Sequence, residues 1–306
     1  MLKRLNIYFK EMYPIIPRLI LGFLVAMEIY FIVLLNQGVT TFDLGIQELI
    51  LGFTIFSFLC WLRIADDFKD YELDCRLFAH RPLPSGRVTK KDLKIFVSIL
   101  IVFTLCINFI FMPFKHFIFC IILYTYGSLM AVWFFQKHKI QKSLPLALLT
   151  HNPVQMIINL YILSFVIMKY NLQIFTLPNI MALFTLYFPA LIWEVSRKIR
   201  APKEETEYVT YSKLFGYKKA VNFVFIVTWM DIITNFILVW NLTKLGVIAL
   251  LINVLWMSWK FIEYKKDPEQ YRIVTKVERY TYIQESMMII IVAAYLIAMA
   301  NGYVLV

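Results

Sequence analysis

Long apolar segments run through the whole chain and leave it few possible folds. A helix needs about 20 apolar residues to cross the hydrocarbon layer of a membrane. Nine candidate segments follow one another, at about residues 16–36, 47–64, 94–112, 116–135, 144–168, 174–195, 219–242, 245–263 and 284–304. Prolines interrupt the fifth and sixth segments, which membranes tolerate only where the freed backbone faces protein or a wet cavity. We therefore expect an all-α membrane protein with about nine transmembrane helices.

The composition excludes an ordinary soluble protein, a disordered chain and a disulfide scaffold. Hydrophobic residues make up 60% of the 306 residues and charged residues 17%, against roughly 45–50% and about 25% in soluble domains. The four cysteines form no CxxC pair, so we expect structural thiols, not a metal or redox centre. No hydrophilic stretch is long enough for a second globular domain. Residues 1–306 are therefore predicted to form a single transmembrane domain.

Basic residues alternate between the loops and predict the topology. Lys and Arg gather at the N-terminus and after the second, fourth, sixth and eighth segments, whereas each remaining loop holds at most one. The positive-inside rule places the basic loops and the N-terminus in the cytoplasm. This distribution also explains the net charge of +11. A nucleic-acid partner is not expected, because the sequence contains no compact nucleic-acid-binding module. No cleavage site follows the first apolar segment and no organelle signal is recognisable, so a bacterial inner membrane is expected.

The cytoplasmic loop after the second segment carries closely spaced carboxylates. These are Asp66, Asp67, Asp70 and Asp74. If the helix continues, Asp66, Asp70 and Asp74 share one face, with Asp67 beside it. Their repulsion would be relieved by a divalent cation such as Mg²⁺, which binds one or two carboxylates, water and substrate phosphates. An acidic helix end neutralised by Lys69 and Arg63 is an equally good interpretation of this spacing alone.

The residues that follow favour the metal interpretation. They read His80-Arg81-Pro82-Leu83-Pro84-Ser85-Gly86-Arg87. Two prolines and a glycine stiffen a turn that would hold Arg81 and Arg87 near the carboxylates. Carboxylates for a metal and arginines for phosphate together suit a diphosphate leaving group.

The two segments resemble the first signature of the UbiA superfamily of intramembrane prenyltransferases. That signature reads N-D-x-x-D-x-x-x-D, followed shortly by N-R-P-L-P-S-G. The aspartates at 67, 70 and 74 and the run from 81 to 86 match it, while Asp66 and His80 stand where Asn is usual. The gap between the two halves is about two residues shorter than usual. The resemblance implies helices around a central cavity, Mg²⁺ held by Asp67, Asp70 and Asp74, and catalytic roles for these residues, Asp66 and Arg81.

The loop after the sixth segment departs from the second signature of that superfamily. The signature supplies two or three further aspartates and ends in Thr or Ser ahead of Leu-Gly. Glu194 is the candidate for its first acid and a further metal ligand, and Thr210 fits its closing part. Cations stand where the other aspartates would fall: Arg197, Lys198 and Arg200.

Four interpretations of this loop stay open. The cations bind diphosphate directly and replace part of the metal charge. Alternatively, Glu204, Glu205 or Glu207 completes a second metal site. In the third interpretation, the reaction is altered or lost. In the fourth, the loop is an ordinary positive-inside loop with incidental acids.

Polar residues elsewhere add candidates for substrate binding. Ionisable and amide side chains within spans usually face the protein interior. His151 and Asn152 lie early in the fifth segment beside Pro153, and Tyr126 lies in the fourth. Lys137 follows the fourth segment and would reach a phosphate, as would Arg87. Helix packing equally explains His151, and topology equally explains Lys137.

The resemblance implies Mg²⁺-dependent transfer of an isoprenyl group from an isoprenyl diphosphate to a lipophilic or phosphorylated acceptor, among membrane lipids. A terpene cyclase of the same superfamily, acting on the isoprenyl diphosphate alone, is one alternative. A non-catalytic relative that binds isoprenoid lipids is another. The sequence does not identify the acceptor.

Overall fold

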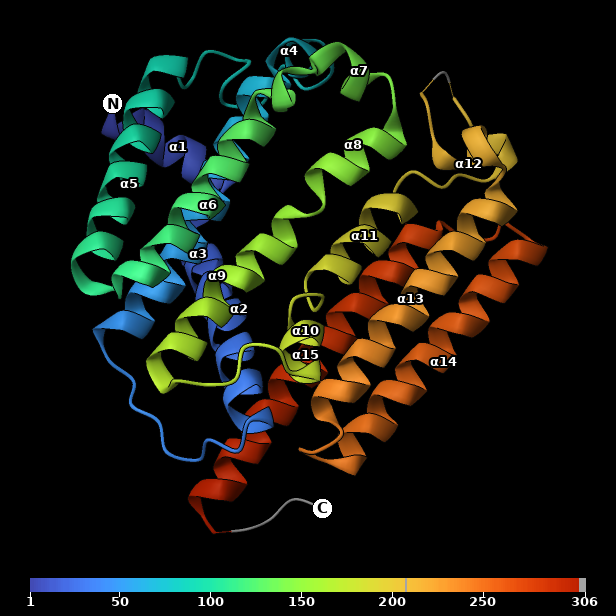
Figure 1. The fold of residues 1–306 in the computed structure, drawn as a ribbon. Coiled ribbons are helices and arrows are strands. Elements are labelled where there is room, and N and C mark those ends of the chain that lie inside the picture. Colours follow the sequence, from blue (N-terminus) through green and yellow to red (C-terminus); the bar gives the residue numbers. More distant parts are fainter. Residues whose placement is uncertain (207, 303–306) are drawn as a thin grey trace. The chain divides into compact units, whose positions relative to one another are not determined.

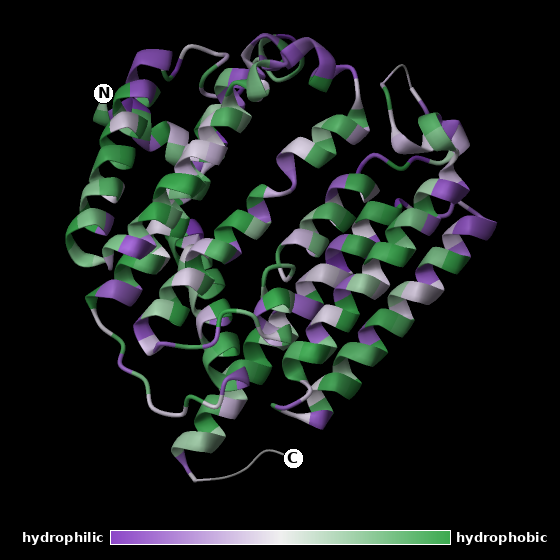
Figure 2. Ribbon diagram, viewed as in Figure 1, coloured by the Kyte–Doolittle hydropathy of each residue, from purple (hydrophilic) through white to green (hydrophobic). Residues whose placement is uncertain are grey.

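The computed structural model describes residues 1–206 and 208–302, and all regular structure in these ranges is helical (Figure 1). Nine helical segments in the described part are long and apolar enough to span a membrane, which confirms the prediction. They are α2 (Ile15–Asn36), α3 (Ile46–Lys69), α5 (Lys90–Phe111), α6 (Phe114–Ala131), α8 (Leu144–His151) with α9 (Val154–Tyr170), α10 (Leu177–Ala182) with α11 (Tyr187–Ser196), α13 (Tyr217–Val239), α14 (Lys244–Lys266) and α15 (Ile273–Ala300). Figure 2 shows apolar residues along these helices and polar residues gathered at their ends.

The prolines divide the fifth and sixth spans where the sequence indicated. Helix α8 ends at His151, and Pro153 precedes α9. In the sixth span, residues 183–186 separate α10 from α11, and Pro189 lies in the first turn of α11. Proline lacks the N–H that would continue the ladder of hydrogen bonds.

The last span begins earlier than expected. The predicted start at residue 284 is wrong, because α15 begins at Ile273. The charged residues of this first part lower its hydropathy. Its buried Ile273, Val277 and Tyr280 nevertheless recur at helical spacing and hold it in the fold.

Short helices and turns complete the described chain. The helices are α1 (Leu2–Met12), α4 (Tyr71–Leu77), α7 (Lys137–Gln141) and α12 (Tyr211–Phe215), and the 3₁₀ turns are η1 (Trp133–Phe135) and η2 (Pro202–Glu204). All three residues of η1 have positive φ, at 55°, 48° and 57°. Bulky residues rarely adopt this left-handed conformation, which costs about 1–2 kcal/mol per residue.

The chain divides into two compact units. The first comprises Met1–Met27 and Phe42–Lys137, and the second comprises Glu28–Thr41 and His138–Val306. The prediction of a single domain over residues 1–306 stays a prediction.

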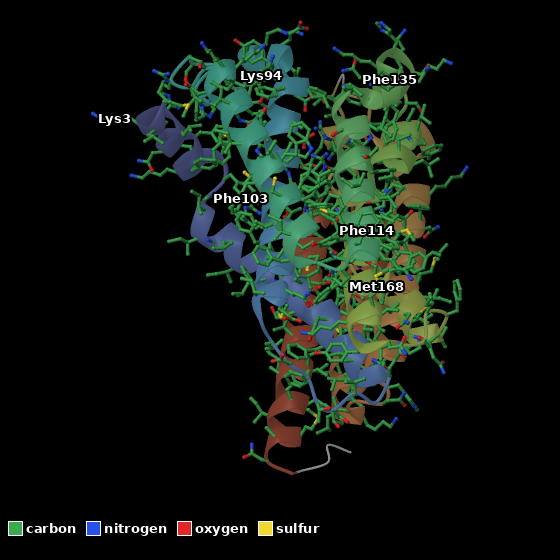
Figure 3. All side chains as sticks on the ribbon, turned by 60° about the vertical axis from the view of Figure 1, so that its left-hand side comes forward. Lys3, Lys94, Phe103, Phe114, Phe135 and Met168 are labelled. Carbon is green, nitrogen blue, oxygen red and sulfur yellow. The ribbon has the colours of Figure 1, made fainter. Side chains whose placement is uncertain are left out.

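In the first unit, α3 packs against α5 and α6, and α1 packs against α5. Leu5, Tyr8 and Phe9 form the buried stripe of α1 and join the apolar core with residues of α3 and α5. Figure 3 shows Lys3 and Lys94 near one end of the unit, and Phe103 and Phe114 farther along its helices. These phenylalanines are 51% and 68% exposed, as expected for side chains that face lipid.

In the second unit, α14 packs between α13 and α15, and α11 contacts both α13 and α15. Polar residues of these spans face the interior, as expected. Asp231 accepts hydrogen bonds from Gln284 at 2.8 Å and Asn235 at 3.3 Å. Asn159 donates to the Ala182 carbonyl and to Thr185, both at 2.9 Å, and so ties α9 to the gap in the sixth span.

Candidate functional site

The first acidic segment lies on a bend in the chain. Helix α3 ends at Lys69, Asp70 has φ −100° and ψ 10°, and α4 begins at Tyr71. The N–H of Asp70 still donates to the carbonyl of Asp66 at 2.9 Å. The helix does not continue through Asp70, so the condition for a shared face of Asp66, Asp70 and Asp74 is not met. Asp66 and Asp70 are exposed, whereas Asp67 and Asp74 are buried.

Each of the two buried carboxylates is neutralised by an arginine. Arg63 donates to Asp67 at 2.7 Å, and Arg81 donates to both oxygens of Asp74 at 3.0 and 2.9 Å. The Tyr8 hydroxyl donates to the second oxygen of Asp67 at 2.5 Å. Burial, together with the Asp67 charge, raises the pKa of Tyr8 well above its usual value. The hydroxyl therefore stays protonated and fixes Asp67 from the side opposite to Arg63.

The two exposed carboxylates are less constrained. The ammonium of Lys69 lies 3.6 Å from Asp66 and 4.1 Å from the centre of the Trp133 ring in η1. Within the described chain, the Asp70 carboxylate has neither a hydrogen bond nor an ion pair. Partial loss of water raises the pKa of Asp70, Lys69 opposes this, and the nearby charges of Asp66 and Asp74 add to it. The segment thus offers two accessible carboxylates beside two fixed ones.

The proline-rich turn holds Arg81 against the buried pair, as predicted. The N–H of Ser85 donates to the Arg81 carbonyl at 3.0 Å, and Gly86 turns the chain with φ +75°. The Arg81 guanidinium stacks on Phe78, 4.0 Å from the ring centre.

Helix α1 holds this segment through three side chains that the sequence analysis missed. Tyr8 reaches Asp67, Arg4 donates to both oxygens of Asp92 at 2.6 and 2.8 Å, and Glu11 accepts hydrogen bonds from Arg87. Arg87 lowers the pKa of Glu11. Arg87, expected to bind substrate, thus ties the turn to α1. Positions 4, 8 and 11 share one face of a helix, and that spacing was the available signal.

The predicted acid of the second loop is already paired with cations. Glu194 lies 2.6 Å from Arg197 and 2.9 Å from Lys198. All three belong to the end of α11 or follow it directly, at helical spacing. Two of the cations that replace the expected aspartates therefore neutralise Glu194.

The other predicted residues of this loop organise its backbone. Arg200 donates to the Thr206 hydroxyl at 2.8 Å. The Thr210 hydroxyl caps α12 by accepting from the Lys213 N–H at 3.0 Å, and it donates to Glu205 at 2.8 Å. Substrate binding by Thr210 and Arg200 stays a prediction.

The remaining candidates lie on other elements. His151 contacts the Ala147 carbonyl at 3.0 Å within α8, and Asn152 donates to the Tyr187 carbonyl at 3.2 Å. These contacts support a structural role in the broken spans. Tyr126 packs edge-on against Phe134, with ring centres 5.4 Å apart, and Lys137 is exposed at the start of α7.

The donor chemistry of the first segment fits Mg²⁺. Within residues 1–206 and 208–302, no three acidic, histidine or thiol groups are placed to enclose a metal by themselves. Mg²⁺ commonly uses only one or two carboxylates and completes its shell with water and substrate phosphates. Three glutamates are the candidates for a second metal site. Of these, Glu205 accepts a hydrogen bond from Thr210, and Glu204 lies 3.7 Å from Arg272. Glu207 lies outside the described residues.

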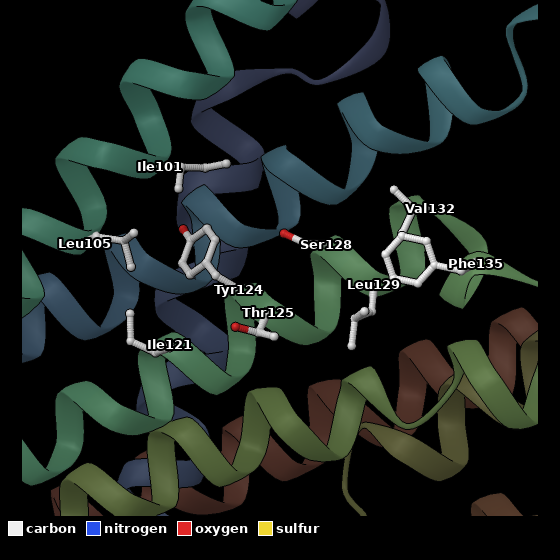
Figure 4. A pocket seen from close by; sticks show the side chains of 9 residues that line it. All are labelled: Ile101, Leu105, Ile121, Tyr124, Thr125, Ser128, Leu129, Val132 and Phe135. Atoms are coloured by element: carbon white, nitrogen blue, oxygen red, sulfur yellow. The ribbon is translucent and has the colours of Figure 1, made fainter.

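An apolar groove of about 440 Å³ lies in the same unit (Figure 4). Its lining comes from α5, α6 and the residues up to η1, and includes Ile101, Leu105, Thr125, Ser128 and Phe135. Tyr124 also lines it, but its hydroxyl is hydrogen-bonded to Ser57 at 2.9 Å. A groove with this lining suits a hydrocarbon chain.

Comparisons with known proteins identify the family of the chain and a similar fold. The model of the UbiA prenyltransferase family matches residues 24–282, which include both loops. A solved structure of digeranylgeranylglyceryl phosphate synthase has a similar fold, with a TM-score of 0.62 and 16% sequence identity over 98% of this chain and 99% of that chain. No curated protein matches. From the extent of the family match, we conclude that this integral, multi-pass membrane protein belongs to the UbiA prenyltransferase family.

Proposed function

We propose that the protein is a Mg²⁺-dependent intramembrane prenyltransferase that moves an isoprenyl group from an isoprenyl diphosphate to an acceptor. The observation that carries the proposal is the difference in burial and pairing among four aspartates. Asp67 and Asp74 are buried and fixed by arginines, while Asp66 and Asp70 remain accessible. Family membership supports the isoprenyl diphosphate as the donor.

The carboxylates of Asp66 and Asp70, with Asp67 and Asp74 beside them, would hold the metal. Bound Mg²⁺ supplies positive charge that stabilises the diphosphate as a leaving group. Arg81 keeps Asp74 in place through one of its terminal nitrogens, so its other N–H groups are available to a phosphate oxygen. Lys69, held over Trp133, adds a second cation next to Asp66.

In the proposed reaction, the bond between the allylic carbon and the bridging oxygen breaks, and the diphosphate leaves with the electron pair. Positive charge placed next to the departing diphosphate stabilises the transition state. The acceptor nucleophile then forms a bond to the allylic carbon and releases a proton. The roles predicted for Glu194, Tyr126, Lys137, His151 and Asn152 remain part of the proposal.

The charge distribution supports a cytoplasmic N-terminus and cytoplasmic site loops. The inner membrane of a bacterium is part of the proposal. The donor and the product would partition among membrane lipids. The apolar groove of the first unit suits such hydrocarbon chains.

Diphosphate release by the purified protein tests the proposal. Isoprenyl diphosphates of several lengths are supplied with and without Mg²⁺, and with and without a membrane extract as acceptor source. We expect Mg²⁺-dependent release that requires the extract and a labelled prenylated product. Release without an acceptor, with a hydrocarbon product, would identify a cyclase. Tight donor binding without release under any condition would identify a non-catalytic isoprenoid-binding protein.

A further inference from the structure

A second cleft with a strongly basic lining lies within the second unit. Its volume is about 360 Å³. It is lined by Arg197, Ile199, Arg200, Glu204, Thr206, Arg272 and Val274. The first five belong to the loop after α11, whereas Arg272 is the N-cap residue of α15 and Val274 lies in its first turn. The cleft therefore joins two loops that are far apart in the sequence.

The three arginines retain many free hydrogen-bond donors. A guanidinium has five N–H groups. Arg197 uses two nitrogens on Glu194, and Arg200 uses one on Thr206. Arg272 lies 3.7 Å from Glu204, which is beyond hydrogen-bond distance, and its side chain is 76% exposed. Most of the donors that line the cleft are thus available to a ligand.

The charge of the lining selects the class of ligand. The lining residues include three arginines and one acid, Glu204, so the lining carries a net charge of about +2. The Glu194 carboxylate that Arg197 binds is also paired with Lys198, outside the lining. A phosphate monoester carries about −1.5 to −2 near neutral pH and has three terminal oxygens. The fork of an arginine matches two such oxygens at once. A single carboxylate, with one negative charge, would leave about half of this charge uncompensated.

We propose that this arginine cleft is a phosphate-monoester site and holds the phosphate headgroup of the acceptor. The assignment to an acceptor rests on the proposed prenyl transfer. The donor's diphosphate is assigned to the aspartates and Arg81 of the first unit, whereas Arg272 belongs to neither of the two signature segments. The shared chemistry is a phosphate monoester, carried by a soluble molecule or by a membrane lipid.

Binding of two probes to the full-length protein tests the site. Radiolabelled glycerol 1-phosphate is measured by equilibrium dialysis in detergent, without Mg²⁺. Phosphatidic acid is compared with phosphatidylcholine in nanodiscs. The main variant is Arg272→Gln, which is expected to fold because Arg272 is exposed and makes no side-chain cap. Lys203→Gln removes the same charge from an exposed position outside the cleft, in the loop after α11, and is the matched control.

We expect Arg272→Gln to weaken binding of the phosphate monoester by about 10-fold or more. Arg272→Lys should recover part of the affinity, because it keeps the charge but loses the fork. Lys203→Gln should bind as the wild-type protein does. The probe that binds, soluble or lipid, identifies the source of the phosphate.

Three results would overturn the proposal. The first is that neither probe binds. The second is that Lys203→Gln weakens binding as much as Arg272→Gln does. The third is that Arg272→Gln weakens Mg²⁺-dependent binding of geranylgeranyl diphosphate as much as it weakens binding of the phosphate monoester. The last would make the cleft part of the donor site. Failure of the proposed function has a different signature, which is phosphate-monoester binding at the cleft without diphosphate release from any donor.

Discussion

Replacing Tyr8 with phenylalanine removes the hydroxyl that α1 offers to the first acidic segment. That hydroxyl donates to Asp67 at 2.5 Å, and Asp67 is only 4% exposed. A hydrogen bond to a charged group contributes about 1.5–3 kcal/mol, and water has little access to replace it here. We expect Tyr8→Phe to lower the free energy of unfolding by about 2 kcal/mol.

The functional effect follows from the position of Asp67. Groups that orient a metal-binding side chain typically change metal affinity by about 10–100-fold when they are removed. The Mg²⁺ concentration for half-maximal diphosphate release should therefore rise by at least about 10-fold. A titration with Mg²⁺ at saturating isoprenyl diphosphate measures this effect.

Tyr13→Phe is the matched control. Tyr13 is also buried, but its hydroxyl donates to the backbone carbonyl of Phe56 at 3.0 Å and to no carboxylate. This variant should lose stability without a change in the Mg²⁺ requirement. Equal Mg²⁺ curves for Tyr8→Phe and Tyr13→Phe would refute the idea that α1 positions Asp67.

Further substitutions separate the accessible aspartates from the fixed ones. Asp70→Asn should abolish Mg²⁺-dependent diphosphate release with little change in Tm, because its carboxylate has no partner among the described residues; a large drop in Tm would contradict this. Asp74→Asn should also lose about 2 kcal/mol of stability, measured by denaturant unfolding, because it disrupts the pairing with Arg81. Because the pKa of Asp70 is raised, its carboxylate is lost as the pH falls through a value above the usual 3.9 or so. The acid limb of the pH–rate profile should lie correspondingly high and should shift in Asp70→Glu. Glu11→Gln should make hydrogen exchange in α1 faster at low salt and insensitive to added salt, because the exposed pair with Arg87 is screened by ions.

Local sequence was sufficient to predict the spans and the proline-rich turn from Arg81 to Gly86. The spans are continuous runs of apolar residues, and the family match and the nine helical segments bear them out. The run from Arg81 to Gly86 likewise specifies its own turn, with hydrogen bonds between residues close in sequence. Such features depend on neighbours that the sequence places side by side.

Contacts between distant segments were not predictable in the same way. The partners of Tyr8 and Arg4 lie 59 and 88 residues farther along the chain. The bend at Asp70 interrupts the helix on which Asp66, Asp70 and Asp74 would share one face, although their period-four spacing favoured a straight helix. Arg272 joins the cleft of Arg197 and Arg200 only because α15 packs against α11. No sequence pattern within either loop predicts that Arg272 lies beside the two other arginines.

The contacts of α1 also fix an order of events during synthesis. Ribosomes extend a chain at about 5–20 residues per second. The partner of Arg4 emerges 88 residues after it, so roughly 4–18 s pass between the synthesis of the two. During that interval the first two spans and the turn from Arg81 to Arg87 are synthesised, while Arg4 of α1 has no Asp92 to bind. The contacts of α1 with Asp67, Arg87 and Asp92 therefore become possible in that order, and the last of them only once the third span begins to appear.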